Sequence, residues 1–132
     1  MIDMEEIREY CLSLPQTSED MAFGEEYLLL RVCGKIFACL GLGRPDYFVV
    51  KCDPDLATEL RDKYQDIEPA WHWNKKYWNQ LRLGGTLTEE LVKALIRHSY
   101  SEVVKKLPKR VRALAPEIMT IDSETTWIKG DL

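Results

Sequence analysis

The chain has 132 residues, of which 45% are hydrophobic and 30% are charged. This length and composition suit one globular domain with a buried core, and they exclude a chain that is disordered throughout. Eighteen Lys and Arg against 22 Asp and Glu give a formal net charge of −4, so the average charge disfavours a strongly basic nucleic-acid-binding protein.

The N-terminus and the cysteines indicate the cellular compartment of the protein. Residues 1–16 carry acids where a signal peptide needs bases, and no apolar run approaches the roughly 18 residues of a membrane span. We therefore expect a soluble, cytoplasmic monomer that makes no membrane contact. The four cysteines lie in apolar runs without CxxC spacing, which favours core packing over disulfides or metal ligands.

The first predicted element is a helix over residues 4–14. Asp3 is a favourable N-cap, and Glu6 three residues later completes a capping box. Pro15 ends this helix.

Three strands are predicted next, over residues 27–32, 36–40 and 47–52. Short turns containing glycine join them, which is typical of antiparallel hairpins. A further strand is expected before them, near residues 21–23.

A second helix is predicted to begin at Asp53, with Pro54 at its first position, and to run to about Tyr64. Residues 67–73 look extended but contain a proline, which indicates an edge strand or an irregular stretch. Residues 78–83 alternate between apolar and polar side chains and predict a strand.

The longest predicted helix begins after Thr88 and ends or kinks at Pro108. This order of elements predicts an α+β fold, a two-layer sandwich with helices packed on one face of an antiparallel sheet. We expect residues 1–115 to form one domain and residues 116–132 to form a loosely attached tail. Four apolar residues of the tail could dock on the domain: Ile118, Ile121, Trp127 and Ile128.

The residues that carry chemistry give little sign of an enzyme. His72 and His98 are far apart in sequence, no Ser or Cys lies in a nucleophile motif, and the P-loop, GxGxxG and HExxH motifs are absent. Residues 41–43 lie between two predicted strands, which favours a hairpin turn over a phosphate loop. We expect neither catalysis nor a cofactor or metal, although a pocket that holds His72 beside an ionised partner would favour an enzyme.

Residues 71–79 are the most unusual segment. They contain four aromatic rings, one His and two Lys in nine residues. Cations beside aromatic rings suit phosphate contact together with stacking. The alternative is that the tryptophans pack in the core while the lysines are merely solvated.

Charge is segregated along the chain. Residues 1–26 contain eight acids and one base, for a charge of −7, whereas residues 97–112 contain six bases and one acid, for +5. Residues 71–83 add three bases and no acid. The acidic and basic segments could pair with each other or face different partners.

Two predicted turns carry a cation, Lys35 in the first and Arg44 in the second. Cations at hairpin tips are common on protein surfaces. Two such tips could also straddle a phosphate backbone.

The chain resembles the MmcQ/YjbR family of small bacterial proteins over about residues 1–112. The resemblance depends on an ordered set of segments rather than on one motif. These are Leu14-Pro15, Phe23-Gly24, Gly34-Lys35-Ile36-Phe37-Ala38, Val49-Val50-Lys51-Cys52-Asp53-Pro54, Asn74-Lys75-Lys76-Tyr77-Trp78-Asn79, Ser99-Tyr100-Ser101-Glu102-Val103-Val104 and Leu107-Pro108.

The resemblance implies a fold like that of frataxin-type (CyaY-like) proteins and DNA binding through a double-wing motif. The wings would be the hairpins near Lys35 and Arg44, and no catalytic residue is implied. The candidate DNA-binding residues are Lys35, Arg44, Lys51, Lys75, Lys76 and Trp78. The alternative function is a frataxin-like module that binds a metal or a protein through the acidic N-terminal segment.

Overall fold

A computed structural model describes residues 2–121. The elements are α1 (Met4–Ser13), β1 (Thr17–Asp20), β2 (Tyr27–Val32), β3 (Lys35–Gly41), β4 (Tyr47–Lys51), α2 (Pro54–Lys63), β5 (Ile67–Pro69), β6 (Trp78–Arg82), α3 (Glu89–Lys105), α4 (Lys109–Leu114) and the 3₁₀ helix η1 (Pro116–Met119). None of the four cysteines, all of which lie within residues 2–121, forms a disulfide. Over residues 2–121, no helix combines the length and apolar character needed to cross a membrane.

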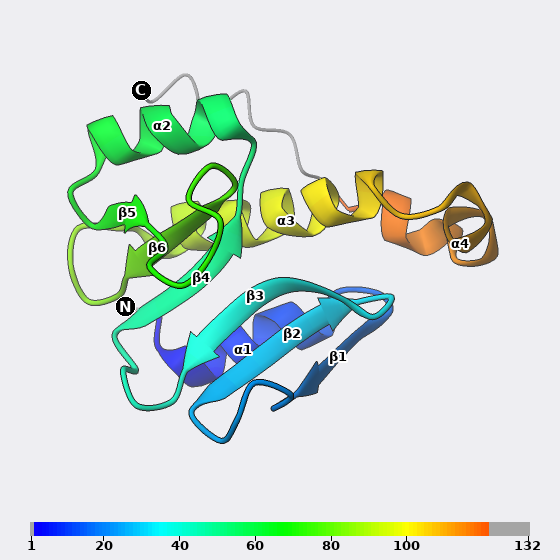
Figure 1. The fold of residues 1–132 in the computed structure, drawn as a ribbon, viewed down its shortest axis with the longest axis horizontal. Coiled ribbons are helices and arrows are strands. Elements are labelled where there is room, and N and C mark those ends of the chain that lie inside the picture. Colours follow the sequence, from blue (N-terminus) through cyan, green and yellow to red (C-terminus); the bar gives the residue numbers. More distant parts are fainter. Residues whose placement is uncertain (1, 122–132) are drawn as a thin grey trace.

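The six strands form one antiparallel sheet in the order β1-β2-β3-β4-β6-β5. Figure 1 shows α1 and α3 side by side behind this sheet, while α2 lies next to β5. The predicted α+β fold, with helices covering one face of an antiparallel sheet, is confirmed. Within residues 2–121, no helix lies over the opposite face of the sheet (Figure 1).

Alternation along β4 separates the two faces of the sheet. Phe48 and Val50 are almost fully buried and belong to the core under the helices, where Leu40 and Leu81 also pack. Residues Tyr47, Val49 and Lys51 alternate with them and are half-buried, so they face the side without helices. Lys51 therefore reaches that side from a strand whose other face is anchored in the core.

The three predicted helix caps are all present. Asp3 Oδ1 accepts a hydrogen bond from the Glu6 amide at 2.9 Å. Asp53 accepts from the first amides of α2, and Thr88 Oγ1 accepts from Leu91 N at 3.1 Å. These local bonds set where each helix begins.

The first strand differs from the expectation. It spans Thr17–Asp20, whereas residues 21–23, where a strand was expected, lie in a turn closed by a bond from Gly24 N to Met21 O. The strand is polar, and Arg31 Nε of β2 donates to Asp20 Oδ2 at 2.5 Å. The apolar pattern missed it because an edge strand is held by its backbone ladder and charged side chains rather than by a buried face.

Helix α3 is tied to the sheet by a buried hydroxyl. Ser99 Oγ donates to Phe37 O at 2.6 Å and accepts from Lys51 N at 2.8 Å. The ladder between β3 and β4 ends at the pair Ala38 and Val50, so this hydroxyl bridges the strands one position beyond their last pair. Ser99 thereby holds the end of β4 in place.

The neighbours of Ser99 anchor two other segments. His98 Nε2 accepts a hydrogen bond from Asp53 N, which precedes α2. Tyr100 is fully buried, meets Phe37 edge-on at 5.5 Å and donates through its hydroxyl to Pro15 O. Three successive residues of α3 thus hold the end of β4, the residue before α2 and a residue between α1 and β1.

The first part of the expected tail lies against the domain. Ile118 is buried in the core, and Gln16 Nε2 donates to Glu117 Oε1 at 2.9 Å. Trp127 and Ile128, which were expected to be able to dock, lie outside the described residues.

Replacing Ser99 with alanine tests the strand bridge. Ser99→Ala leaves a buried donor at Lys51 N and a buried acceptor at Phe37 O, so we expect the free energy of unfolding to fall by about 1–3 kcal/mol. Chemical denaturation measures it. Ser101→Ala, in the same helix, is the control, because it changes helix propensity equally without removing the bridge. Equal stability of the two variants would contradict the role given to Ser99.

Candidate functional site

Two features of the molecule could bind a ligand. One is a group of lysines around Tyr77, and the other is a pocket between the loop that follows β5 and the turn between β3 and β4. Both depend on the loop of residues 70–77, which connects β5 to β6. This loop contains most of the aromatic segment singled out in the sequence.

Backbone and side-chain bonds fix the loop. Asn74 closes it, because its carbonyl oxygen accepts from the amides of Tyr77 and Trp78, and its Oδ1 accepts from Lys76 N. Arg61 of α2 donates to Lys75 O. The Tyr77 carbonyl in turn accepts from Cys52 N at 2.7 Å, next to the end of β4. The Tyr77 ring is therefore presented from a fixed backbone.

Three ammonium groups surround that ring. Lys106 Nζ lies 5.0 Å from the ring centroid, Lys76 Nζ 5.4 Å and Lys51 Nζ 5.9 Å, all within cation–π range. They come from three places in the chain: the end of β4, the loop and the C-cap of α3. We call Lys51, Lys76 and Lys106 the lysine cluster.

The lysine cluster carries excess positive charge. Burial lowers the pKa of Lys51, and the charge of Lys106 lowers it further, while Glu102 opposes them. Glu102 itself is ion-paired with Lys105 Nζ at 2.8 Å. Among the described residues, no carboxylate lies within ion-pair distance of the cluster's ammonium groups. The like charges are thus held together without a direct ion pair, and Glu102 offsets part of the repulsion at Lys51, which favours binding of an anion.

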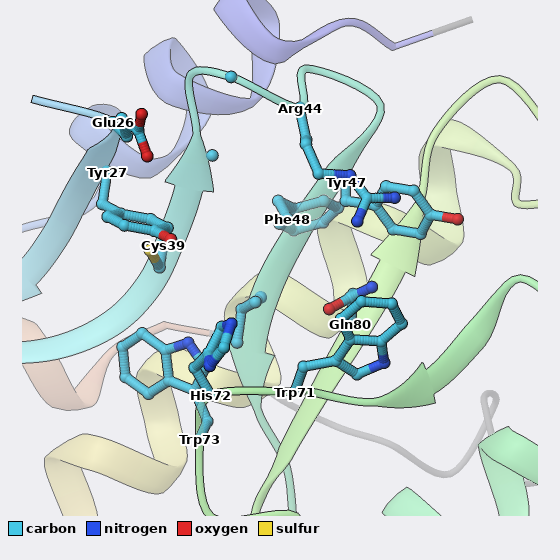
Figure 2. A pocket seen from close by; sticks show the side chains of 13 residues that line it. Glu26, Tyr27, Cys39, Arg44, Tyr47, Phe48, Trp71, His72, Trp73 and Gln80 are labelled. Atoms are coloured by element: carbon cyan, nitrogen blue, oxygen red, sulfur yellow. The ribbon is translucent and has the colours of Figure 1, made fainter.

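The second feature is a cavity of about 350 Å³, which we call the aromatic pocket (Figure 2). Its floor is the sheet, and its walls are the loop and the turn between β3 and β4. Figure 2 shows the Arg44 side chain reaching from that turn over Tyr47. The lining residues are Glu26, Tyr27, Cys39, Gly41, Gly43, Arg44, Tyr47, Phe48, Val49, Trp71, His72, Trp73 and Gln80. His72 thus lies in a pocket, but among residues 2–121 no carboxylate forms an ion pair with it.

Aromatic contacts link the pocket to the lysine cluster. The Arg44 guanidinium lies 4.5 Å from the Tyr47 ring centroid and 5.8 Å from that of Trp71. Trp73 packs against Trp78 with ring centroids 4.6 Å apart. Trp78 is the strand partner of Lys51, so the pocket and the cluster are joined along one face.

The structure separates the six residues expected to bind DNA. Lys51 and Lys76 join the lysine cluster, and Trp78 lies beside it. Lys75 Nζ donates to Trp71 O at 3.0 Å, so this side chain supports the loop. Lys35 and Arg44 lie at or just beyond opposite ends of β3.

Lys35 begins β3 and Arg44 follows its other end, so the two turns lie about 20 Å apart along that strand. This differs from the expectation that neighbouring tips straddle one phosphate backbone. Consecutive hairpins that share a strand turn at opposite ends of it. Because β4 runs antiparallel to β3, Lys35 lies at the same end of the sheet as Lys51, whereas Arg44 lines the pocket.

Three contributors were not identified from the sequence. Lys106 belongs to the basic segment 97–112, but no local sequence pattern predicted its contact with the Tyr77 ring. Glu26 and Tyr27 line the pocket although they were not candidates. The concentration of aromatic rings in residues 71–79 was the one signal that pointed to this face.

The acidic N-terminal segment is partly neutralised within the fold. Arg8 pairs with Glu19 at 2.6 Å and with Glu5 at 3.0 Å, and Arg31 pairs with Asp20. Hydrogen bonds from these arginines lower the pKa of Glu19 and of Asp20. Within residues 2–121, no three or more His, Cys, Asp or Glu side chains are grouped so that they could hold a metal ion.

Sequence comparison identifies relatives over most of the chain. A family model described as YjbR matches residues 12–102. Protein YjbR of Escherichia coli (strain K12) is 28% identical over 115 residues, which cover 86% of this chain and 97% of that protein. Protein YbdF of Escherichia coli O157:H7 is 33% identical over 107 residues, covering 80% and 88%. Both relatives are described as uncharacterized.

Solved structures share the fold. The crystal structure of Deinococcus radiodurans protein DR2400, with a DUF419 domain, matches with a TM-score of 0.79 at 32% identity, covering 92% of this chain and 91% of that one. A Pseudomonas syringae protein has a TM-score of 0.60 at 24% identity, with coverages of 72% and 93%, and shows the fold alone. The matched segment, the relatives and the fold agree with the resemblance noted in the sequence, and the chain belongs to the YjbR family.

Proposed function

We propose that the protein binds DNA through phosphate contacts at the lysine cluster, with little sequence preference and without catalysis. One observation carries the proposal. Three ammonium groups from separate elements converge on the Tyr77 ring, and no acid of the described chain pairs with them. A phosphate placed among them would relieve their mutual repulsion and release counterions from the nucleic acid.

The surroundings of the cluster support a polyanion as the ligand. Lys35 lies at the same end of the sheet, and α4 supplies Lys109 and Arg110, both exposed, just beyond Lys106. Most acids of residues 1–26 lie on α1, β1 and the turn after it, away from this end of α3 (Figure 1). The net charge of −4 is thus compatible with a local basic surface, while it limits the affinity.

The proposed contact site on the protein differs from the one that a double-wing motif would use, although the ligand is DNA in both cases. The double-wing arrangement would use Lys35 and Arg44 together, whereas their separation along β3 argues for the lysine cluster as the principal contact. Phosphate contacts carry no sequence information, which is the reason for proposing little sequence preference.

Charge removal at the cluster tests the proposal. We expect Lys76→Gln and Lys106→Gln, singly and together, to weaken binding to a fluorescent DNA duplex in an anisotropy titration. Each lost phosphate contact should reduce the slope of log K against log salt by about 0.9. Both side chains are exposed, so the fold should tolerate these changes.

Lys93→Gln is the matched control. Lys93 lies near the start of α3, about 20 Å along the helix from Lys106, and pairs with Glu89. We expect this variant to bind DNA like the original protein. Loss of affinity equal to that of Lys106→Gln would show a general charge effect, and no binding by the original protein at micromolar concentration and low salt would rule out the proposal.

Binding should also change the titration of Lys51. Its pKa is lowered by burial and by Lys106, so a bound phosphate, which favours the charged form, should raise it. NMR detection of the lysine side chains with and without duplex DNA measures this shift. Lys106→Gln should raise the same pKa without DNA, whereas Lys106→Arg, which keeps the charge, should not. An unchanged Lys51 titration in the complex would place the phosphates elsewhere.

A further inference from the structure

The aromatic pocket exposes large rings to solvent. Trp71 at its rim is 58% exposed, and Tyr27 on the opposite wall is 38% exposed. The Trp73 ring contacts those of Trp78 and Phe23, with ring centroids 4.6 and 6.1 Å apart, so other aromatic side chains support this part of the wall. Exposed rings around a preformed cavity are typical of a site for a flat ligand.

Two groups of opposite charge face the cavity from different sides. Figure 2 shows Arg44 on the side of Tyr47 and Glu26 on the side of Tyr27. Among the described residues, no ion pair engages either group. The guanidinium can donate to a phosphate, and the carboxylate can accept from an exocyclic amino group.

The size and position of the pocket narrow the class of ligand. A cavity of about 350 Å³ lies at the small end of the usual range for ligand sites, which suits one nucleotide rather than a helix or a paired base. A chain of neighbours links the pocket to the lysine cluster, because Trp73 of the pocket packs against Trp78 and Trp78 pairs with Lys51. Cations therefore lie at both ends of an aromatic surface, as in surfaces that bind single strands.

From this arrangement we infer that the aromatic pocket receives the base of an unpaired nucleotide, with its phosphate at Arg44. The inference depends on the proposed function, because the lysine cluster would hold neighbouring phosphates of the same strand. It specifies the ligand class further: single-stranded nucleic acid binds more tightly than duplex, whose bases are stacked inside the helix. Glu26 could accept a hydrogen bond from an exocyclic amino group, which adenine, cytosine and guanine all carry, so the pocket adds little preference among these bases.

The test compares three labelled ligands of about 12 nucleotides: a single strand, a duplex and a single strand without bases. Trp71→Ala removes an exposed ring and should lower affinity for the ordinary single strand about 5- to 100-fold, with little change for the other two ligands. Leu114→Ala is the control, because it removes an apolar side chain that is 86% exposed on α4. It should leave all three affinities unchanged. Quenching of tryptophan fluorescence reports entry of a base into the pocket.

The outcomes separate this inference from the proposed function. Binding that depends on Lys76 and Lys106 but is insensitive to Trp71→Ala overturns the pocket's role and leaves the DNA-binding proposal standing. Absence of binding to every strand and duplex overturns the proposed function. Quenching by free adenosine monophosphate with an affinity equal to that of the strand overturns the single-strand inference, because the pocket would then serve a free nucleotide.

Discussion

The hydroxyl of Ser99 is the contact on which the rest of the arrangement depends. It joins Phe37 of β3 to Lys51 of β4 where their ladder has ended, and so fixes both strand ends against α3. The same helix continues to Lys106, which sets the distance between two members of the lysine cluster. A bond buried in the core thereby determines which charges meet at the surface.

The two faces of the sheet carry different kinds of side chain. One face is covered by helices and supplies the hydrophobic core, so the other needs little apolar area for stability. That second face instead holds rings and charges in contact with each other, such as Arg44 over Tyr47 and the lysines around Tyr77. Aromatic rings are what allow cations to remain there without acids, since a ring face attracts a cation and leaves its charge available to a ligand.

Much of the fold could be predicted because its signals are local. The caps at Asp3, Asp53 and Thr88 and the apolar spacing of α3 each lie within a few residues of the structure they specify. Strand β1 could not be located because its side chains are polar and its position is set by pairing with β2. At the site, the composition of residues 71–79 indicated a functional segment. The contact between Tyr77 and Lys106 depends on packing between distant segments, so no local sequence pattern predicts it.

The two edge strands of the sheet limit how a partner can bind to it. One edge is β1, a strand of four polar residues, and the other is β5, which has three residues and ends in Pro69. Short, charged or proline-terminated edges resist the addition of a foreign strand. The sheet is therefore closed to growth along its hydrogen-bonding direction, and recognition is directed to side chains on its broad face, where a partner is selected by charge and ring stacking rather than by backbone pairing.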